Sequence, residues 1–480
     1  MGISLNPSSL LSGDGLDVAS LVNQILYQKS GQLSDWGSEQ SLLRVQAGLL
    51  TTINSDLTSL ADAVTALSDP LGALTAQAAI SSNPAVLTAS ADISAVAGAH
   101  SLVVNNLASA GVVYTDSVSG GANISILPSG ITTASLEVQI GGAGGTTAEI
   151  QITAGINDTL ATLANSINQQ SAAASWGVQA AVVSDSNGSR LSIRSEATGT
   201  PGAVAIKGNT SSLTFNSPVG GTNASLTIDG IPYVSTTNTI TGAIAGLTLH
   251  ISSAAPSSPV LLTVGADTAK IAGAVNTFVD AYNRVISGIN SQFKIDAATN
   301  TEGPLGSDGT LRTLQSILLQ DVTYWIPENS GLVNLASLGI NMNDDGTLTV
   351  GNTASGQSMS QVLASNTQAF QNFFQNAAGT GFASAFHTDL MKLTDSTQGL
   401  LNLDLAQNKT QQQNLADTIS NFQDQLATQQ KALTSQFSLV NASLQAYPLL
   451  LQQVTQTLAT MDIGYSGNSS SSHPIKTSGL

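Results

Sequence analysis

The sequence predicts an α+β multidomain protein in which the terminal helices pair as a coiled-coil leg domain and antiparallel β-rich domains are inserted in the middle. Helical periodicity occurs in residues 14–67 and again in 267–462. Residues 80–265 instead alternate polar and apolar side chains between turn signals. Because the helical stretches lie at opposite ends of the chain, we expect the ends to meet and the β part to project. The length of 480 residues suggests about three domains.

A heptad pattern defines the first helical stretch. Its core positions alternate spacings of three and four residues, which is typical of a left-handed coiled coil. We expect Asp69-Pro70 to end the helix, because proline disfavours a helical residue before it. An ordinary core within one chain explains the pattern as well, so pairing within or between chains stays open. The predicted positions are Leu43, Gln46, Leu50, Ile53, Leu57, Leu60, Val64 and Leu67.

The middle of the chain predicts strands separated by turns, with one short helix at residues 160–169. Asn187-Gly188 between two alternating runs predicts a hairpin turn. An amphipathic helix is expected to begin at Thr268. Strands are expected at residues 101–107, 135–140, 148–153, 178–184, 191–194, 226–230, 244–251 and 260–264.

The C-terminal stretch carries two further seams. Pro448 lies inside the second one, so we expect one helix to end near Tyr447 and another to run to Met461. Residues 464–480 are rich in Ser and Gly and are predicted to be disordered. The first seam comprises Leu415, Ile419, Phe422, Leu426, Gln429 and Leu433, and the second comprises Phe437, Val440, Leu444, Tyr447, Leu451, Val454, Leu458 and Met461.

The composition disfavours several classes of function. The net charge is −17, and charged residues make up only 9% of the chain. An acidic chain without a basic stretch is not expected to bind nucleic acid or an anionic membrane surface. No apolar run is long enough to insert into a membrane. The absence of cysteine excludes disulfides and thiolate metal sites.

Motifs that suggest chemistry are better explained as turns. Residues 185–196 place oxygen-bearing side chains as a calcium loop does, but Arg190 stands where that loop needs glycine. The glycine-rich residues 141–145 lead into a strand rather than a phosphate-binding helix, which favours a hairpin loop. Asp344-Asp345-Gly346 likewise predicts a turn.

The histidines match no catalytic or metal-binding motif, and His100 and His250 are expected to be strand residues facing solvent or a sheet neighbour. The other two are His387 and His473. No catalytic constellation is found, so we expect a non-enzymatic protein without catalytic residues, metal or cofactor.

Segments spread in order over nearly the whole chain resemble one family pattern. Its opening is similar to residues 12–22, where Gly15, Leu16 and Asp17 match after one extra residue. The pattern F-V-x-A-Y-N is matched by Phe278, Tyr282 and Asn283. The full set is residues 12–22, 141–206, 226–230, 237–240, 243–249, 278–283, 303–312, 338–341, 345–350 and 436–444.

On these motifs the chain resembles the flagellar filament cap proteins, also called the flagellar hook-associated protein 2 family. The resemblance implies a homo-oligomer, a ring of about four to six copies, at the distal tip of the bacterial flagellum. It implies that the cap promotes insertion and folding of exported flagellin and prevents its loss. The implied partners are flagellin, the hook–filament junction proteins and an export chaperone. Export would use the flagellar type III system, which agrees with the lack of a recognisable cleaved signal.

The resemblance and the pattern together give expected domain bounds. Residues 1–40 form an N-terminal segment, partly disordered until assembly. Residues 41–75 with 267–447 form the helical leg, and 76–115 with 222–266 form a β plate. Residues 116–221 form an inserted β-rich domain, and 448–480 a C-terminal helix and disordered tail.

A second interpretation is a surface adhesin of the flagellar tip whose β domains bind glycans. The low charge and the richness in Ser, Thr, Gly and Asn suit an extracellular surface and do not distinguish the two functions.

Overall fold

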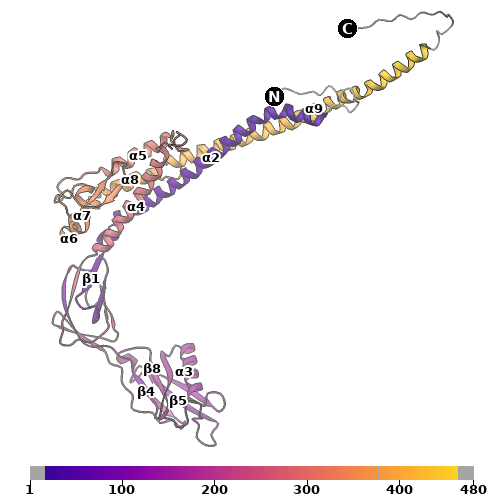
Figure 1. Cartoon of the computed structure of the whole chain (residues 1–480). Helices are drawn as coiled ribbons and strands as arrows, with labels where there is room; N and C mark the ends of the chain where they lie inside the picture. The colour runs from indigo at the N-terminus through magenta and orange to yellow at the C-terminus, as the bar shows by residue number, and fades with distance from the viewer. Residues whose placement is uncertain (1–16, 377, 463–480) are drawn as a thin grey trace, which may run out of the picture.

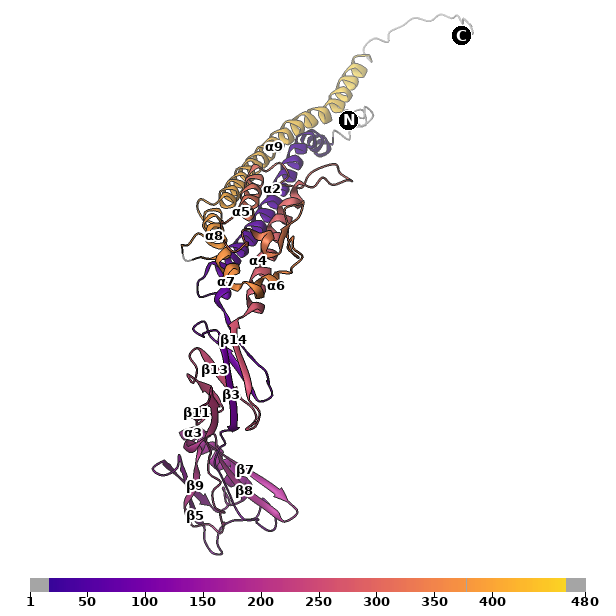
Figure 2. The ribbon, with the colours of Figure 1, turned by 90° about the vertical axis from the view of Figure 1, so that its left-hand side faces the viewer.

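The computed structural model describes residues 17–462 except residue 377, and it shows an elongated molecule (Figure 1). Two long helices, α2 (Val18–Ser68) and α9 (Leu400–Asp462), run side by side. At one end they enter a cluster of shorter helices, beyond which two β domains follow in line (Figure 2). The predicted α+β multidomain class, with terminal helices and inserted antiparallel sheets, is confirmed.

Helix α2 begins far earlier than residue 41, where the leg domain was expected to start. The side chain of Asp17 accepts a hydrogen bond from the backbone N–H of Ser20 at 3.0 Å, which satisfies an otherwise unpaired group at the helix start. The helix ends at Ser68, directly before Asp69-Pro70 as predicted. Residues 18–40 lie within this helix and pack along α9.

The helical head is the cluster of α4–α8 packed on the C-terminal half of α2. Its apolar core joins Leu57 and Leu60 of α2 to Phe278 and Tyr282 of α4 and to Phe386 of α8. Its elements are α4 (Thr268–Phe293), α5 (Gly309–Val322), α6 (Met359–Ser365), α7 (Thr367–Phe374), α8 (Phe382–Leu393), η1 (Ala73–Thr75), η3 (Leu335–Leu338) and the strand pair β15 (Ile340–Met342) and β16 (Leu348–Val350).

Next to the head lies a sandwich domain, residues 77–108 and 221–266 (Figure 2). Its two sheets enclose a core of Leu, Val and Ile side chains. The larger sheet has the order β1 (Gln77–Ser81), β14 (Val260–Ala266), β3 (Gly98–Asn106), β10 (Ala224–Ile228) and β11 (Ile231–Ser235). The smaller has the order β12 (Thr239–Thr241), β13 (Leu247–Ile251) and β2 (Leu87–Ala91).

The inserted domain, residues 112–215, forms the far end of the molecule. Helix α3 (Leu160–Ala174) contributes Leu160, Leu163 and Ile167 to the core of this domain. One sheet has the order β4 (Val112–Tyr114), β8 (Gly188–Ser195) and β7 (Val178–Asp185). The other has the order β6 (Thr146–Thr153), β5 (Thr133–Ile140) and β9 (Val204–Asn209), and the short helix η2 (Thr200–Gly202) precedes β9.

The predicted turn at Asn187-Gly188 is displaced by one residue. Asp185 pairs with Gly188, so Ser186 and Asn187 form the tip of the β7–β8 hairpin. Gly188 serves a close contact instead: a Cβ there would lie 2.5 Å from the carbonyl oxygen of Val118. A hairpin is confirmed over residues 185–196, where a calcium loop was the other interpretation.

The expected helix break at Pro448 is wrong, since α9 continues through it to Asp462. Proline lacks an N–H group and crowds the preceding turn, at a cost of about 3 kcal/mol in a helix interior. Residues 445–460 are all exposed. Water can therefore hydrogen-bond the carbonyl group one turn earlier, which Pro448 leaves without its N–H partner. Residues 464–480 and His473 lie outside the described residues.

Candidate functional site

The candidate site is the set of surfaces along the paired terminal helices and the β domains. In the described range, 17–462 without 377, no cluster of three or more His, Asp or Glu side chains is arranged to hold a metal ion. Over the same residues no helix is long and apolar enough to cross a membrane.

The predicted N-terminal seam residues mostly belong to the helical head. Ile53 faces Gly288 of α4, and Thr65 Oγ1 lies 3.1 Å from Nδ1 of His387 on α8. These contacts place the C-terminal half of α2 against α4 and α8. The buried seam residues are Leu43, Leu50, Ile53, Leu57, Leu60, Val64 and Leu67.

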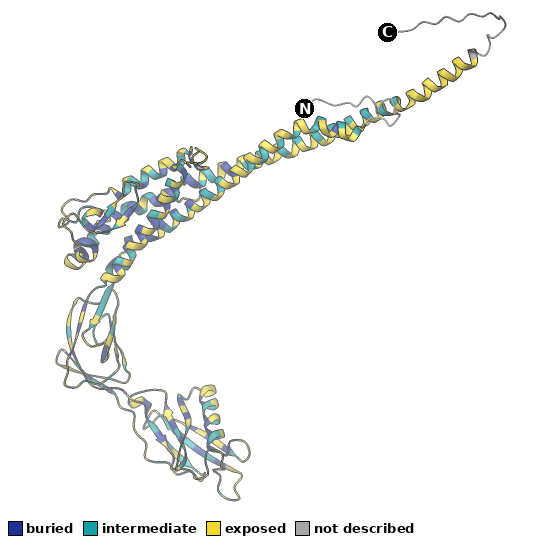
Figure 3. Ribbon diagram, in the orientation of Figure 1, coloured by how far each residue is buried: buried dark blue, intermediate teal, exposed yellow. Residues whose placement is uncertain are grey.

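Beyond the head, α2 and α9 form a projecting pair, residues 18–46 and 412–444 (Figure 3). Lys29 Nζ donates to Oε1 of Gln429 at 3.0 Å, and the Gln412 amide donates to the carbonyl of Leu43 at 3.4 Å. The two helices are therefore antiparallel. Trp36 meets Phe422 edge to face, with ring centroids 5.2 Å apart.

The register shows that the two predicted seams are offset. Asn402, near the start of α9, bonds Asn54. The C-terminal seam therefore lies opposite residues 18–43 of α2, and the seam expected at 43–67 packs mainly on α4 and α8. Sequence periodicity identified both apolar stripes but could not assign their partners.

Residues of the C-terminal seam are only half covered. The partly buried ones are Leu415, Ile419, Phe422, Leu426, Leu433, Phe437 and Leu444. Val440 is 48% exposed, because the pattern after Phe437 continues at Asn441. Past Leu444 the apolar side chains of α9 stand in solvent, as Figure 3 shows. They include Tyr447, Leu449, Leu450, Leu451, Val454 and Leu458.

The described residues of the family motifs stabilise the fold. Phe278 and Tyr282 are fully buried in α4, and Asn283 accepts a bond from the backbone N–H of Leu348 and donates to its carbonyl, each at 2.7 Å. Asn283 thus fixes the β15–β16 pair to α4. Asp17 caps α2. Gly15 and Leu16 lie outside the described residues.

Sequence reasoning missed two pairs of carboxyl groups in and beside the head. Burial, and next the Asp389 carboxylate, raises the pKa of Asp321 to about 7. Burial, and next the carboxyl group of Asp308, raises the pKa of Asp404 to about 6. One oxygen of Asp321 and one of Asp404 are buried without a partner. The acidic side chains are far apart in sequence, so no local pattern could have revealed them.

The second pair lines a polar cavity of about 130 Å³ where three helices meet. Gln46 of α2, Asp308 before α5 and Asn408 of α9 all contribute to its wall. Burial also raises the pKa of the Tyr282 phenol, whose oxygen has no partner. Unpaired buried oxygens therefore occur both at the junction between the head and the projecting pair and within the core of the head.

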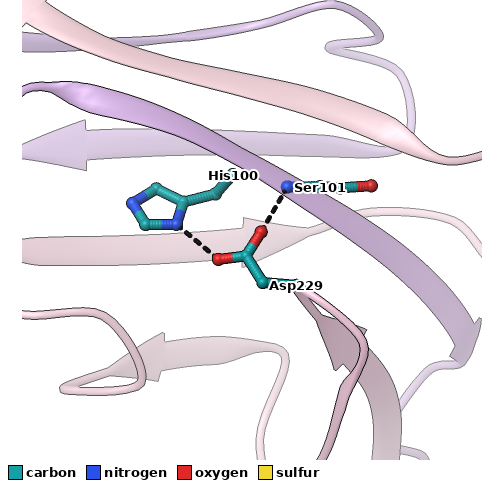
Figure 4. Close-up of polar contacts among 3 residues, drawn as sticks. All are labelled: His100, Ser101 and Asp229. Carbon is teal, nitrogen blue, oxygen red and sulfur yellow. Dashed lines mark hydrogen bonds and ion pairs between the residues drawn. The ribbon is translucent and has the colours of Figure 1, made fainter.

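A histidine–aspartate contact holds the β10–β11 hairpin to β3 (Figure 4). Nδ1 of His100 lies 2.7 Å from Oδ2 of Asp229, and Oδ1 accepts the backbone N–H of Ser101 at 2.8 Å. Asp229 and Gly230 form the turn with φ of 51° and 84°, which explains the Asp-Gly pair. The bond from His100 lowers the pKa of Asp229 below its ordinary value.

Two family profiles match the chain and together cover about two thirds of it. The profile described as "Flagellar hook-associated protein 2 N-terminus" matches residues 14–111. "Flagellar hook-associated protein 2 C-terminus" matches residues 221–447. The gap between the two matched ranges coincides with the inserted domain, so the family matches fall on the projecting pair, the head and the sandwich domain.

Individual relatives agree. The chain is 25% identical over 477 residues to the B-type flagellar hook-associated protein 2 of Pseudomonas aeruginosa, covering 93% of this chain and 97% of the relative. It is 28% identical over 356 residues to flagellar hook-associated protein 2 of Escherichia coli K12, covering 69% and 73%. The crystal structure of the flagellar cap protein FliD D1-D2-D3 domains from Escherichia coli matches with a TM-score of 0.54 and 25% identity, over 75% of this chain and 99% of that one.

A helical leg followed by two β domains in line is thus the architecture of flagellar cap proteins. The chain belongs to the flagellar hook-associated protein 2 family. The relatives are structural proteins of the flagellum, and their likeness does not favour the adhesin interpretation.

Proposed function

We propose that this chain caps the distal end of the flagellar filament as a ring of copies, promotes the insertion and folding of exported flagellin there, and prevents its loss. The likeness to flagellar hook-associated protein 2 along almost the whole chain carries the proposal. The relative of known structure from Escherichia coli is a flagellar cap protein.

The mechanism is steric and mechanical. The projecting pair docks on the filament end, and the β domains form a plate over the channel exit. Flagellin folds in the sheltered space between them. The half-covered seam and the exposed end of α9 supply apolar surface for docking, and the low charge means that few ion pairs have to break when a leg moves.

Further partners follow from the same proposal. The ring contains about four to six copies, starts on the hook–filament junction proteins, and is delivered by an export chaperone. The protein acts outside the cell, at the distal tip, after export by the flagellar type III system. Its role is structural rather than enzymatic.

The test removes the chain from the bacterium that makes it. The deletion strain should carry short or no filaments and release flagellin into the medium, and the intact chain should restore filaments. Electron microscopy measures filament length, and an immunoblot of the medium measures released flagellin. Filaments of normal length without the chain would refute the proposal, and normal filaments with lost surface attachment would favour an adhesin.

Light scattering of the purified chain across a concentration series gives the copy number. A discrete assembly of about four to six copies supports a preformed ring. A monomer at every concentration would mean that the ring forms only on the filament end.

A further inference from the structure

The sandwich domain is almost free of charge although the chain is strongly acidic. Residues 77–108 and 221–266 contain no Lys or Arg and only two acidic residues, Asp92 and Asp229. Both acidic side chains bond within the domain: Asp92 Oδ1 accepts the N–H of Ser94 at 2.7 Å, and Asp229 is held by His100 and Ser101. The other parts of the molecule therefore carry nearly all of the charge of −17.

The outer face of the five-stranded sheet is uncharged and partly apolar. Ile80 is 69% exposed, Val234 61% and Leu261 50%. The strand register places small and hydroxyl side chains around them. Outward positions are Ile80, Ala99, Ser101, Val103, Ser225, Thr227, Pro232, Val234, Leu261 and Thr263. Exposed apolar side chains gathered on one face are characteristic of an interaction surface.

The opposite side of the sandwich is uncharged as well. The three-stranded sheet pairs Thr248 with Ser90 and with Thr241, and it pairs His250 with Thr88 and with Thr239. These residues alternate with the buried Leu247, Leu249 and Ile251 and therefore point outward. The sandwich thus offers two different faces, one partly apolar and one rich in threonine, on opposite sides of one domain.

A closed ring of more than two copies needs such a pair of faces, because each copy meets its neighbours through two different surfaces. Acidic copies repel each other, so contact costs least where both partners lack charge. We propose that the outer face of the five-stranded sheet of one copy packs on the three-stranded face of the next. This inference rests on the proposed function, which requires copies to assemble, and it assigns the surfaces used.

The chemistry of these faces also fixes how the contact responds to salt. Burial of apolar and hydroxyl groups, without ion pairs across the contact, is not screened by ions. Added salt instead reduces the repulsion between the acidic parts of the copies. Self-association therefore stays constant or strengthens as salt rises, whereas a contact held by ion pairs would weaken.

Photo-cross-linking of the full chain tests the two faces directly. Leu261 is replaced by p-benzoylphenylalanine, and the variant is mixed with isotope-labelled chain and irradiated. We expect cross-links to peptides of the labelled chain that contain residues 87–91 or 239–251. Val183 on β7 of the inserted domain, 58% exposed, is the matched control position and should give none there. Cross-links from 261 to any other surface of the labelled chain, or to none, would overturn the assignment.

Two charge variants give a second readout. Ile80→Glu and Leu261→Glu each place a carboxylate on the face and should weaken self-association at least about tenfold. Val183→Glu should leave it unchanged. Circular dichroism verifies that each variant is folded. Unchanged association of folded Ile80→Glu and Leu261→Glu, or an association that weakens with salt, would contradict the proposal.

Complementation separates this inference from the function on which it rests. If the face variants associate normally and restore filaments to the deletion strain, the assigned faces are wrong and the cap function stands. If the unaltered chain fails to restore filaments, the cap function falls, whatever the cross-links show.

Discussion

Helix α2 has two halves that differ in burial. From Leu50 to Leu67 its seam is enclosed by α4, α8 and the rest of the head, and each of its predicted residues is buried. Along residues 18–43 the covering element is mainly α9, with contacts that include Lys29–Gln429 and Trp36–Phe422. The heptad shows which side of a helix is apolar, but the number of neighbouring helices decides how strongly that side is held.

Because of this difference, we expect the head and the projecting pair to differ in their free energy of unfolding. The head should unfold only as a whole, because its core joins helices from both ends of the chain. The projecting pair buries less and leaves polar groups in its contact, so it should open locally. A leg that docks on a growing filament needs such an end, which can exchange partners while the head keeps its shape.

The largest effect is expected inside the head. Leu57→Asp together with Leu60→Asp places two charges at fully buried positions. Each unpaired buried charge costs about 3–5 kcal/mol, so the head should lose most of its stability in urea unfolding. Leu42→Asp, at a position on the same helix that is 47% exposed, is the control. A double variant with normal unfolding, oligomerisation and motility would contradict this account of the core.

A smaller, local effect is expected in the projecting pair. Trp36→Ala removes the edge-to-face contact with Phe422 and should cost about 1–2 kcal/mol of local stability. Amide exchange in residues 20–40 and 415–437 should accelerate while the unfolding midpoint of the head stays constant. Tyr27→Ala, at a position 79% exposed, should change neither. A lower midpoint for the head would show that the two halves of α2 unfold together.

The pH dependence of the head gives a third test. The pKa of Asp321 is raised to about 7 in the fold, so between its ordinary pKa of 3.8 and 7 the folded chain holds a proton that the unfolded chain has released. This carboxyl group therefore makes the head less stable as pH rises through that window. Asp389 adds repulsion, and Lys392 opposes it.

Asp321→Asn should remove this contribution. The variant should be more stable than the unaltered chain at pH 8 and close to it near pH 4, as measured by urea unfolding. Asp344→Asn, in the exposed turn between β15 and β16, is the matched control. Equal stability of Asp321→Asn and the unaltered chain at pH 8 would rule out a buried charge at this position.

The smallest effect on unfolding is expected at the exposed end of α9. Pro448→Ala restores a backbone donor in a stretch where residues 445–460 are all exposed. Helix content near this position should rise slightly, and exchange there should slow. The head should unfold at the same midpoint, and a shift would mean that the end of α9 is coupled to it.

Local sequence patterns predicted the elements well where one interaction dominates. The β5–β6 and β7–β8 hairpins, helix α3 and the end of α2 at Asp69-Pro70 all follow from spacing and turn residues. The misplaced turn at Gly188 arose because that glycine serves a tertiary contact with Val118. The predicted helix break at Pro448 was wrong, because in an exposed helix water can hydrogen-bond the carbonyl group that lacks a backbone donor.

The candidate surfaces were harder to predict. The offset between the two seams depends on where α9 begins beside Asn54, which no spacing encodes. The carboxyl pairs join residues such as Asp308 and Asp404 that meet only in three dimensions. The uncharged strands of the sandwich were visible in the sequence, but their outward positions required the strand register.

Hydrogen exchange of the intact chain, resolved along its length, tests the central claim most directly. We predict that residues 50–67 and 271–289 exchange only through global unfolding. Residues 20–40 and 415–437 should exchange at least about a hundredfold faster, through local opening. Equal protection in both halves of α2 would contradict the account, because the leg would then be one rigid unit without an end free to dock.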